Sequence, residues 1–180
     1  MNMHTKSILT TRQVDLTIKR LAHQIIENHL GLEHTVIIGL QPRGIFVSNR
    51  IVDELGKIIA PGKILYGKMD ITFYRDDIRN NLHIANETSI NFDIENKTVI
   101  LIDDVLWTGR TIRAALDALL DFGRPSKVEL CVLIDRRFQR QLPIQATYTG
   151  RAIDTYHQQK VKVCWKENDA NDEVLLISED

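Results

Sequence analysis

The stretch VILIDDVLWTGRTI, from Val99 to Ile112, contains the features that decide the fold and the chemistry. Its four consecutive apolar residues are typical of a strand that is buried on both faces of a parallel sheet. The carboxylates of Asp103 and Asp104 follow directly, and Thr-Gly-Arg-Thr then opens the periodicity of a helix. The stretch therefore predicts a strand that ends at the Asp pair, a polar loop and a helix.

Three other apolar runs predict further strands of the same sheet. TVIIGL (35–40), KILYGKMDITFY (63–74) and KVELCVLID (127–135) are rich in apolar and β-branched residues. Near the C-terminus, ATYTG, KVKVCW and EVLLI predict extra strands or a small flap. The segment 75–96 is polar, rich in Asn and Asp and without firm periodicity, which predicts a long mobile loop or an irregular hairpin.

Helical periodicity separates these strands. Apolar residues recur every three to four positions from Thr11 to Leu30, with Thr10 and Gln13 placed for a capping box and Gly31 placed to end the helix. IFVSNRIVDEL (45–55) predicts a second helix. The third helix starts in the TGRT segment, and we expect it to bury Ile112, Ala115, Leu116, Leu119 and Leu120.

Length and composition set limits on domain number and location. The 180 residues support one α/β domain over residues 1–180, with a central, mostly parallel sheet flanked by helices. The net charge of −1 gives no overall positive field that would attract nucleic acid. No apolar run approaches the about 18 residues that a membrane span needs. We therefore expect no membrane association and a cytoplasmic location.

Cysteines and histidines indicate neither a disulfide framework nor a metal centre. The chain has two cysteines, and Cys131 lies in an apolar run, so we expect it to be a buried, inert thiol. Five histidines show no metal-ligand spacing and are expected at the surface: His4, His29, His34, His83 and His157.

Polar turns follow three of the predicted strands, namely QPRG, DDVLWTGRT and DRRFQR. Ligands of open α/β sheets bind at the carboxyl ends of the strands, so these turns are expected to converge on one crevice. Backbone N–H groups and hydroxyls of TGRT, at the start of a helix, suit a phosphate. Two adjacent carboxylates suit the diol of a sugar. A sugar phosphate satisfies both, although an Asp pair or a TGRT segment alone is also common for structural reasons.

These motifs resemble the 5-phosphoribosyl-1-pyrophosphate (PRPP) binding motif of type I phosphoribosyltransferases. VILIDDVLWTGRTIRAALDAL, DFGRPSKVELCVLIDR and MDITFYRDD together resemble the PyrR family, from about residue 17 to about residue 150. The resemblance implies a type I phosphoribosyltransferase fold with a flexible loop and a small flap or hood. It also implies conversion of uracil and PRPP to UMP and pyrophosphate, Mg²⁺ carried by PRPP without dedicated protein ligands, a homodimer, and regulation of pyrimidine genes through leader mRNA.

The resemblance further implies which residues form the site. Those for PRPP are Gln41, Pro42, Arg43, Gly44, Asp103, Asp104, Val105, Leu106, Trp107, Thr108, Gly109, Arg110 and Thr111. The catalytic residues would be Asp103, Asp104, Arg43 and Arg75, the last at the start of the flexible loop. The base would contact Ile134, Asp135, Arg136, Arg137 and Phe138. The loop at 41–44 would contain a cis peptide, whose position Pro42 leaves open, and no general base is assigned.

The chain departs from the family pattern at several positions. Trp107 stands where members usually carry Tyr, and DRRFQRQLPIQATYTGR is one residue longer than the usual base-binding turn. A family His is absent from that turn, and Gln145 replaces a usual Arg. The candidate RNA-binding residues are Lys19, Arg20, His23, Arg140 and Arg151. Our hypothesis is an active enzyme whose RNA-binding face is weakened or retargeted. The alternatives are a purine-base phosphoribosyltransferase and a nucleotide-sensing RNA-binding regulator with little or no turnover.

Overall fold

A parallel sheet forms the centre of the computed structural model, which describes residues 3–74, 86–156 and 158–179. The strands lie in the order β3-β2-β4-β5-β6, and the four pairings are all parallel. Their bounds are β2 Thr35–Leu40, β3 Leu65–Met69, β4 Thr98–Leu106, β5 Lys127–Arg137 and β6 Tyr148–Asp154. The predicted α/β class with a mostly parallel sheet is confirmed.

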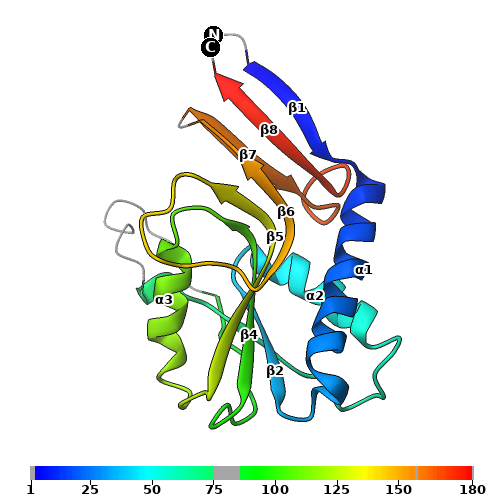
Figure 1. The fold of residues 1–180 in the computed structure, drawn as a ribbon, viewed down its shortest axis with the longest axis vertical. Helices are drawn as coiled ribbons and strands as arrows, with labels where there is room; N and C mark the ends of the chain where they lie inside the picture. The colour runs from blue at the N-terminus through cyan, green and yellow to red at the C-terminus, as the bar shows by residue number, and fades with distance from the viewer. Residues whose placement is uncertain (1–2, 75–85, 157, 180) are drawn as a thin grey trace.

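Helices cover both faces of this sheet (Figure 1). They are α1 Thr11–Asn28, α2 Gly44–Leu55 and α3 Arg110–Leu119. Successive side chains of a strand point to opposite faces, so Ile100 and Ile102 pack with α1 and α2, whereas Val99 and Leu101 pack with α3. Because both faces are covered, the strand needs an unbroken apolar run rather than alternation.

A second, antiparallel sheet lies beyond the carboxyl end of the first one (Figure 1). Its order is β1-β8-β7, with bounds β1 Met3–Leu9, β7 Gln159–Cys164 and β8 Glu173–Glu179. We call this sheet the hood. The predicted flap is thus confirmed for KVKVCW and EVLLI, whereas ATYTG belongs to β6 of the main sheet. Strand β1 was not predicted, because MHTKSIL is mostly polar and exposed and pairs only with β8.

The helix α1 begins where its capping signal predicts. The Thr10 N–H donates to Oε1 of Gln13 over 2.9 Å, which is the side-chain-to-backbone half of a capping box. The helix ends at Asn28, two residues before the predicted end, and a 3₁₀ turn, Leu30–Leu32, follows. Gly31 lies inside this turn with a φ of 73°.

Two strands end elsewhere than predicted, and one helix buries a different face. The strand predicted at 63–74 ends at Met69, because the Asp70 carboxylate accepts the N–H groups of Thr72 (2.7 Å) and Asn86 (2.8 Å) and turns the chain; a 3₁₀ turn, Thr72–Tyr74, follows. The strand β4 passes the Asp pair, because pairing with β5 continues as far as Leu106. On α3 the buried stripe is rotated toward two alanines, Ala114 and Ala118, which leaves Leu116 and Leu120 37% and 68% exposed.

The predicted long loop is described only from Asn86 onward. Residues 75–85, which include Arg75 and His83, lie outside the described residues, as does His157. The described remainder contacts β3 through one antiparallel bridge between Lys68 and Ser89, as in an irregular hairpin. Within the described ranges, every helix is too short or too polar to cross a bilayer.

Candidate active site

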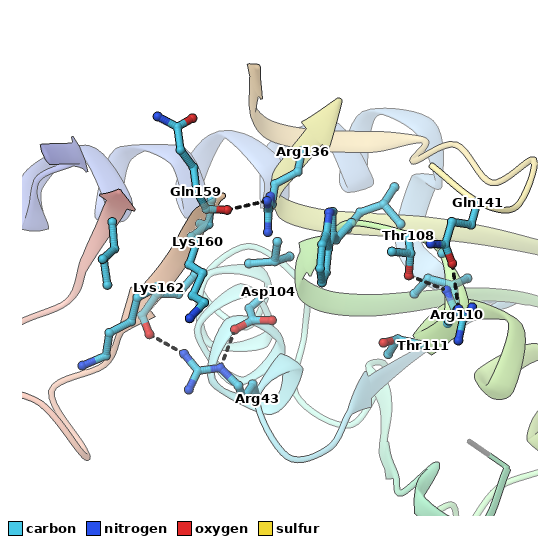
Figure 2. A pocket seen from close by; sticks show the side chains of 18 residues that line it. Arg43, Asp104, Thr108, Arg110, Thr111, Arg136, Gln141, Gln159, Lys160 and Lys162 are labelled. Atoms are coloured by element: carbon cyan, nitrogen blue, oxygen red, sulfur yellow. Dashed lines mark hydrogen bonds and ion pairs between the residues drawn. The ribbon is translucent and has the colours of Figure 1, made fainter. Parts of the chain in front are cut away.

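A cavity of about 930 Å³ lies between the carboxyl ends of β4 and β5 and the hood strand β7 (Figure 2). All three predicted turns contribute to its wall: Arg43 from the first, the continuous segment 104–112 from the second, and Arg136 from the third. Their predicted convergence on one crevice is confirmed. The fourth wall is β7, from Gln159 to Val163, which sequence reasoning did not assign to the site.

The two neighbouring carboxylates occupy different environments. Asp104 lines the cavity, and its Oδ2 accepts a hydrogen bond from Nε of Arg43 over 2.9 Å. Both residues are 7% exposed, but Asp103 does not line the cavity; its Oδ1 accepts the N–H of Asp104 over 2.9 Å. The alternation of a strand separates the two side chains. Asp104 is therefore available to a ligand, and Asp103 holds the backbone beneath it.

The start of α2 brings Arg43 close to Asp104. A Cβ on Gly44 would lie 2.5 Å from the carbonyl oxygen of Ile102, so only glycine permits this approach of α2 to β4. The guanidinium of Arg43 also donates through Nη2 to the carbonyl of Val163 in the hood, as Figure 2 shows. Arg43 thus links the first turn, the Asp pair and the hood.

Two other residues of the first turn lie outside the cavity. The peptide between Gln41 and Pro42 is cis, which gives the position of the cis bond that the resemblance implied. The Gln41 side chain donates to the carbonyl of Glu87 over 2.7 Å and lines a separate pocket of about 400 Å³, and Pro42 is exposed.

The loop before α3 presents the start of a helix to the cavity. Gly109 precedes the helix with a φ of 93°, a conformation that favours glycine. The only hydrogen bond described from a backbone N–H of this helix start to a side chain is a long one, from the Arg110 N–H to Thr108 Oγ1 over 3.4 Å. Thr108, Arg110 and Thr111 line the cavity with Gly109. The first N–H groups of a helix lack intrahelical acceptors and carry the positive end of its dipole. This end of the cavity therefore suits an anion, and phosphate above all.

Charge in the cavity is strongly unbalanced. Among the described residues, its walls carry five cationic side chains, Arg43, Arg110, Arg136, Lys160 and Lys162, against the single carboxylate of Asp104. Outside the wall, Asp169 pairs with Lys162 over 2.8 Å. One of the cations is itself buried: Arg136 is 5% exposed and donates to Thr155 Oγ1 (3.2 Å) and the carbonyl of Gln159 (2.8 Å). This burial lowers the pKa of its guanidinium. Such a site attracts a ligand with several negative charges.

Of the five residues predicted to contact the base, only Arg136 lines the cavity. Ile134 is fully buried, and the carboxylate of Asp135 accepts a hydrogen bond from Arg140. Arg137 pairs with Asp154 over 2.7 Å, and Phe138 is 80% exposed with a φ of 72°.

Sequence reasoning missed the lysines of the hood and two glutamines. Lys160, Lys162, Gln159 and Gln141 line the cavity beside the predicted residues (Figure 2). The alternation Lys-Val-Lys-Val in β7 places both lysines on one face of a strand, which is a detectable signal. Their position over the cavity depends on how the hood packs, and no local pattern in the chain predicts that packing.

Four of the five candidate RNA-binding residues lie on α1 and the neighbouring β6. Arg20 donates to the carbonyls of Thr149 and Gly150, next to Arg151, whose Nη1 donates to the carbonyl of Ile8 over 2.8 Å. Lys19 pairs with Asp15 over 2.8 Å, and His23 is exposed. Arg140 lies elsewhere, at the rim of the cavity, where it donates to the carbonyl of Trp107 and to Asp135.

A second polar cluster lies at the opposite, amino end of the sheet. The Glu129 carboxylate is within 2.8 Å of both His29 Nε2 and the Tyr148 hydroxyl and within 2.6 Å of Lys127 Nζ. His29 is thus half-buried in a polar network, and its prediction as a plain surface residue is wrong. The prediction for Cys131 is confirmed, because it is fully buried and burial raises the pKa of its thiol to about 12. The described residues hold no group of three potential metal ligands.

Comparison with protein families and curated proteins gives consistent matches. The family described as phosphoribosyl transferase domain matches residues 4–168. A protein named bifunctional protein PyrR from Desulfosudis oleivorans is 46% identical over 171 residues, which cover 94% of each chain. The protein of the same name from Bacillus cereus is 42% identical over 173 residues, covering 94% of this chain and 95% of the relative.

Solved structures with the same fold are more distant in sequence. A hypoxanthine phosphoribosyltransferase from Staphylococcus aureus aligns with a TM-score of 0.64 at 22% identity, over 83% of this chain and 77% of its own. A hypoxanthine-guanine phosphoribosyltransferase from Bacillus anthracis aligns with a TM-score of 0.64 at 21% identity, over 85% of both chains. At this identity the likeness establishes the fold alone.

Proposed function

Because the chain belongs to the phosphoribosyl transferase family, and within it to the PyrR proteins, we propose that it transfers the phosphoribosyl group of PRPP to uracil. The products are UMP and pyrophosphate. The single observation that carries this proposal is the cavity, whose wall combines the start of α3, five cationic side chains and the carboxylate of Asp104. The phosphates of PRPP match the helix start and the cationic side chains, and its ribose diol matches the carboxylate.

Different residues of the cavity would bind different parts of PRPP. The 5′-phosphate would accept hydrogen bonds from the N–H groups and hydroxyls of the loop 108–111. The Asp104 carboxylate would accept hydrogen bonds from the ribose hydroxyls. Asp103 would position Asp104 through its backbone. Arg43 lies beside Asp104 and would pair with the pyrophosphate, releasing its present hydrogen bond to Asp104 as the diol binds.

Departure of pyrophosphate leaves positive charge on the anomeric carbon and negative charge on the leaving group. A carboxylate beneath the ribose stabilises the first, and Arg43 with the hood lysines stabilises the second. Because these groups are already held in place, they need little reorganisation when the bond breaks. The base would enter beside Arg136, whose guanidinium donates to acceptor atoms of the ring.

The donor set fits Mg²⁺ that arrives with PRPP. Mg²⁺ commonly binds through one or two carboxylates together with substrate phosphates, and Asp104 provides one such carboxylate in the cavity. When bound, the ion neutralises charge on the pyrophosphate.

Product formation from a panel of bases tests the proposal. With PRPP and Mg²⁺ present, we expect UMP and one equivalent of pyrophosphate from uracil, and no nucleotide from guanine, hypoxanthine or orotate. The Asp104→Asn variant serves as the inactive control. Preference for a purine would establish a different base specificity, and nucleotide binding without turnover with any base would favour the regulator.

A specific arrangement favours RNA binding as a second function. Lys19, Arg20 and His23 lie on α1, and Arg20 contacts β6 at Gly150, next to Arg151; neither element lines the cavity. The name of the relatives, bifunctional protein, agrees with two activities in one chain. We infer that this surface binds leader RNA of pyrimidine genes. Arg140 does not belong to this surface, because its side chain is bonded to Trp107 and Asp135 beside the cavity.

The salt dependence of RNA binding tests this second function. The logarithm of the RNA association constant decreases linearly with the logarithm of the salt concentration. The steepness of this decrease should become smaller by about 0.7 to 0.9 for each phosphate contact that a variant loses. Lys19→Met should therefore make the dependence less steep, and Arg140→Met should leave it unchanged. Equal slopes for the wild type and Lys19→Met, or no binding of a leader hairpin at low salt, would contradict it.

A further inference from the structure

The segment 139–142, which belongs to the base-binding turn, contacts the loop 107–111 at the start of α3, which we call the phosphate loop. Trp107 Nε1 donates to Gln139 Oε1 over 2.6 Å, and the carbonyl of Thr108 accepts the Gln141 N–H over 2.9 Å. Arg110 Nε then donates to Gln141 Oε1 over 2.8 Å. The base turn and the phosphate loop are therefore joined by side chains beyond β5.

Gln139 also completes a closed circuit of four residues. Its Nε2 donates to the carbonyl of Thr155 over 3.3 Å, and Thr155 Oγ1 accepts Nε of Arg136 over 3.2 Å. The guanidinium of Arg136 lies 4.5 Å from the ring centroid of Trp107. The hydrogen bond from Trp107 Nε1 to Gln139 closes the circuit. Each member is thus held by two others, through three hydrogen bonds and one cation–π contact.

The circuit places an aromatic ring and a cation on the cavity wall in one fixed relation. Trp107 is 42% exposed and, like Arg136, lines the cavity. Among the described residues, no carboxylate pairs with Arg136, whose partners are a hydroxyl, a carbonyl and the indole ring. Its charge therefore remains available to a ligand, and the orientation of Trp107 determines where that charge lies.

We propose that Gln139 is a positioning residue for this reaction, which fixes the Trp107 indole against Arg136 so that the phosphate loop and the base side of the cavity are set as one unit. The inference rests on the proposed function of the cavity. Without the Gln139 acceptor the indole can turn about its side-chain bonds, and Arg136 loses the face on which it stacks. Both substrates then meet a less ordered site.

The variant Gln139→Met tests this role, because methionine keeps the side-chain length and removes both hydrogen bonds. We expect the KM values for PRPP and for uracil each to rise about 3- to 10-fold, with kcat within about 2-fold, as for loss of one or two neutral hydrogen bonds. Gln145→Met is the matched control: Gln145 is exposed, lies farther along the same connection between β5 and β6 and has no described hydrogen bond, so both KM values should stay unchanged. A rise in neither KM for Gln139→Met, or in that for PRPP alone, would overturn the proposal.

A double-mutant cycle with Trp107→Phe tests whether Gln139 acts through the indole. Phenylalanine keeps a ring but removes the N–H donor. If the proposal holds, Gln139→Met should change KM less than about 2-fold in the Trp107→Phe background, so that the two effects are not additive. Independent, multiplicative effects would overturn it.

Binding of Mg²⁺-PRPP, measured by calorimetry, separates this inference from the proposed function. Failure of the wild-type protein to bind PRPP would contradict the proposed function itself. Binding by the wild type that is about 3- to 10-fold weaker in Gln139→Met supports the positioning role, with Gln139→Glu, which keeps the acceptor, restoring part of the loss. Equal affinities for the wild type and Gln139→Met would overturn the positioning role and leave the proposed function intact.

Discussion

The two ends of the central sheet hold charged residues in opposite states. At the amino end, the Glu129 carboxylate is 4% exposed and is bonded to Lys127, His29 and Tyr148. At the carboxyl end, the walls of a cavity of about 930 Å³ carry five cationic side chains and, among the described residues, one carboxylate. A satisfied network stabilises the fold, whereas an unbalanced open one leaves its interactions for a ligand.

The ionisation of the amino-end cluster agrees with this contrast. Burial alone would raise the pKa of Glu129, but hydrogen bonds from Lys127, His29 and Tyr148 outweigh it and hold that pKa below its ordinary value. Burial chiefly raises the pKa of the Tyr148 hydroxyl to about 12, and Glu129 adds to the increase. At neutral pH the cluster therefore contains an ionised carboxylate and a neutral phenol.

The largest expected effect is on catalysis, from a change at the carboxyl end. Asp104→Asn should lower kcat/KM about 100- to 1,000-fold, because it removes charge where positive charge develops. Asp103→Asn should cost less than about 10-fold, because the amide oxygen still accepts the Asp104 N–H. Steady-state kinetics on both variants, with circular dichroism to check folding, measures the difference. Equal losses would mean that the two carboxylates share one role.

At the amino end, Glu129→Gln should affect stability and spare catalysis. Loss of the charge weakens three hydrogen bonds to a buried group, which costs about 1 to 3 kcal/mol in the free energy of unfolding. Urea denaturation measures this cost. At a temperature where the variant is folded, its kcat/KM should stay within about 2-fold of wild type. A catalytic loss as large as that of Asp104→Asn would remove the distinction between the two ends.

The pH dependence of the unfolding free energy, compared between wild type and Glu129→Gln, tests the role of the Glu129 charge. A carboxylate with a lowered pKa stabilises the fold above its unfolded pKa, about 4.3 for Glu, and this stabilisation is lost as pH falls through the folded pKa. The difference in unfolding free energy between wild type and Glu129→Gln should therefore narrow as the pH falls below about 4. A difference that stays the same or widens in that acidic range would contradict a lowered pKa of Glu129.

A smaller effect is expected from the hood. Figure 2 shows the Lys160 side chain extending from β7 over the cavity near Asp104. Lys160→Met should raise the KM for PRPP about 3-fold at low salt and less at 0.5 M salt, because exposed charges are screened. Lys127→Met, at the amino end, is the matched control and should not change this KM. A salt-independent rise would indicate a packing role for Lys160.

The strands and the phosphate loop could be predicted because local chemistry determines them. The apolar run before Asp103 requires a buried strand, and Gly109 followed by Arg110 and Thr111 requires a turn into a helix. Long-range packing determines the features that were missed. The hood lysines enter the site only because β7 pairs with β8, and Leu116 is exposed because α3 rests on its alanines.

The Asp pair shows how one motif can contain two roles. In the sequence, Asp103 and Asp104 are equivalent neighbours, and the family resemblance implies that both bind the ribose. The continuation of β4 to Leu106 keeps them on a strand, where adjacent side chains diverge, and only Asp104 lines the cavity. The resemblance likewise implies that Arg137 and Phe138 contact the base, and the structure places them outside the cavity.

Calorimetric titration of Mg²⁺-PRPP into wild type, Arg43→Ala and Glu129→Gln tests the central claim most directly. The claim is that the carboxyl end binds PRPP through unbalanced charge and that the amino end only stabilises the fold. Loss of the Arg43 charge should weaken binding by about 10-fold or more, and Glu129→Gln should bind as tightly as wild type. Unchanged affinity in Arg43→Ala, or an equal loss in Glu129→Gln, would contradict the account.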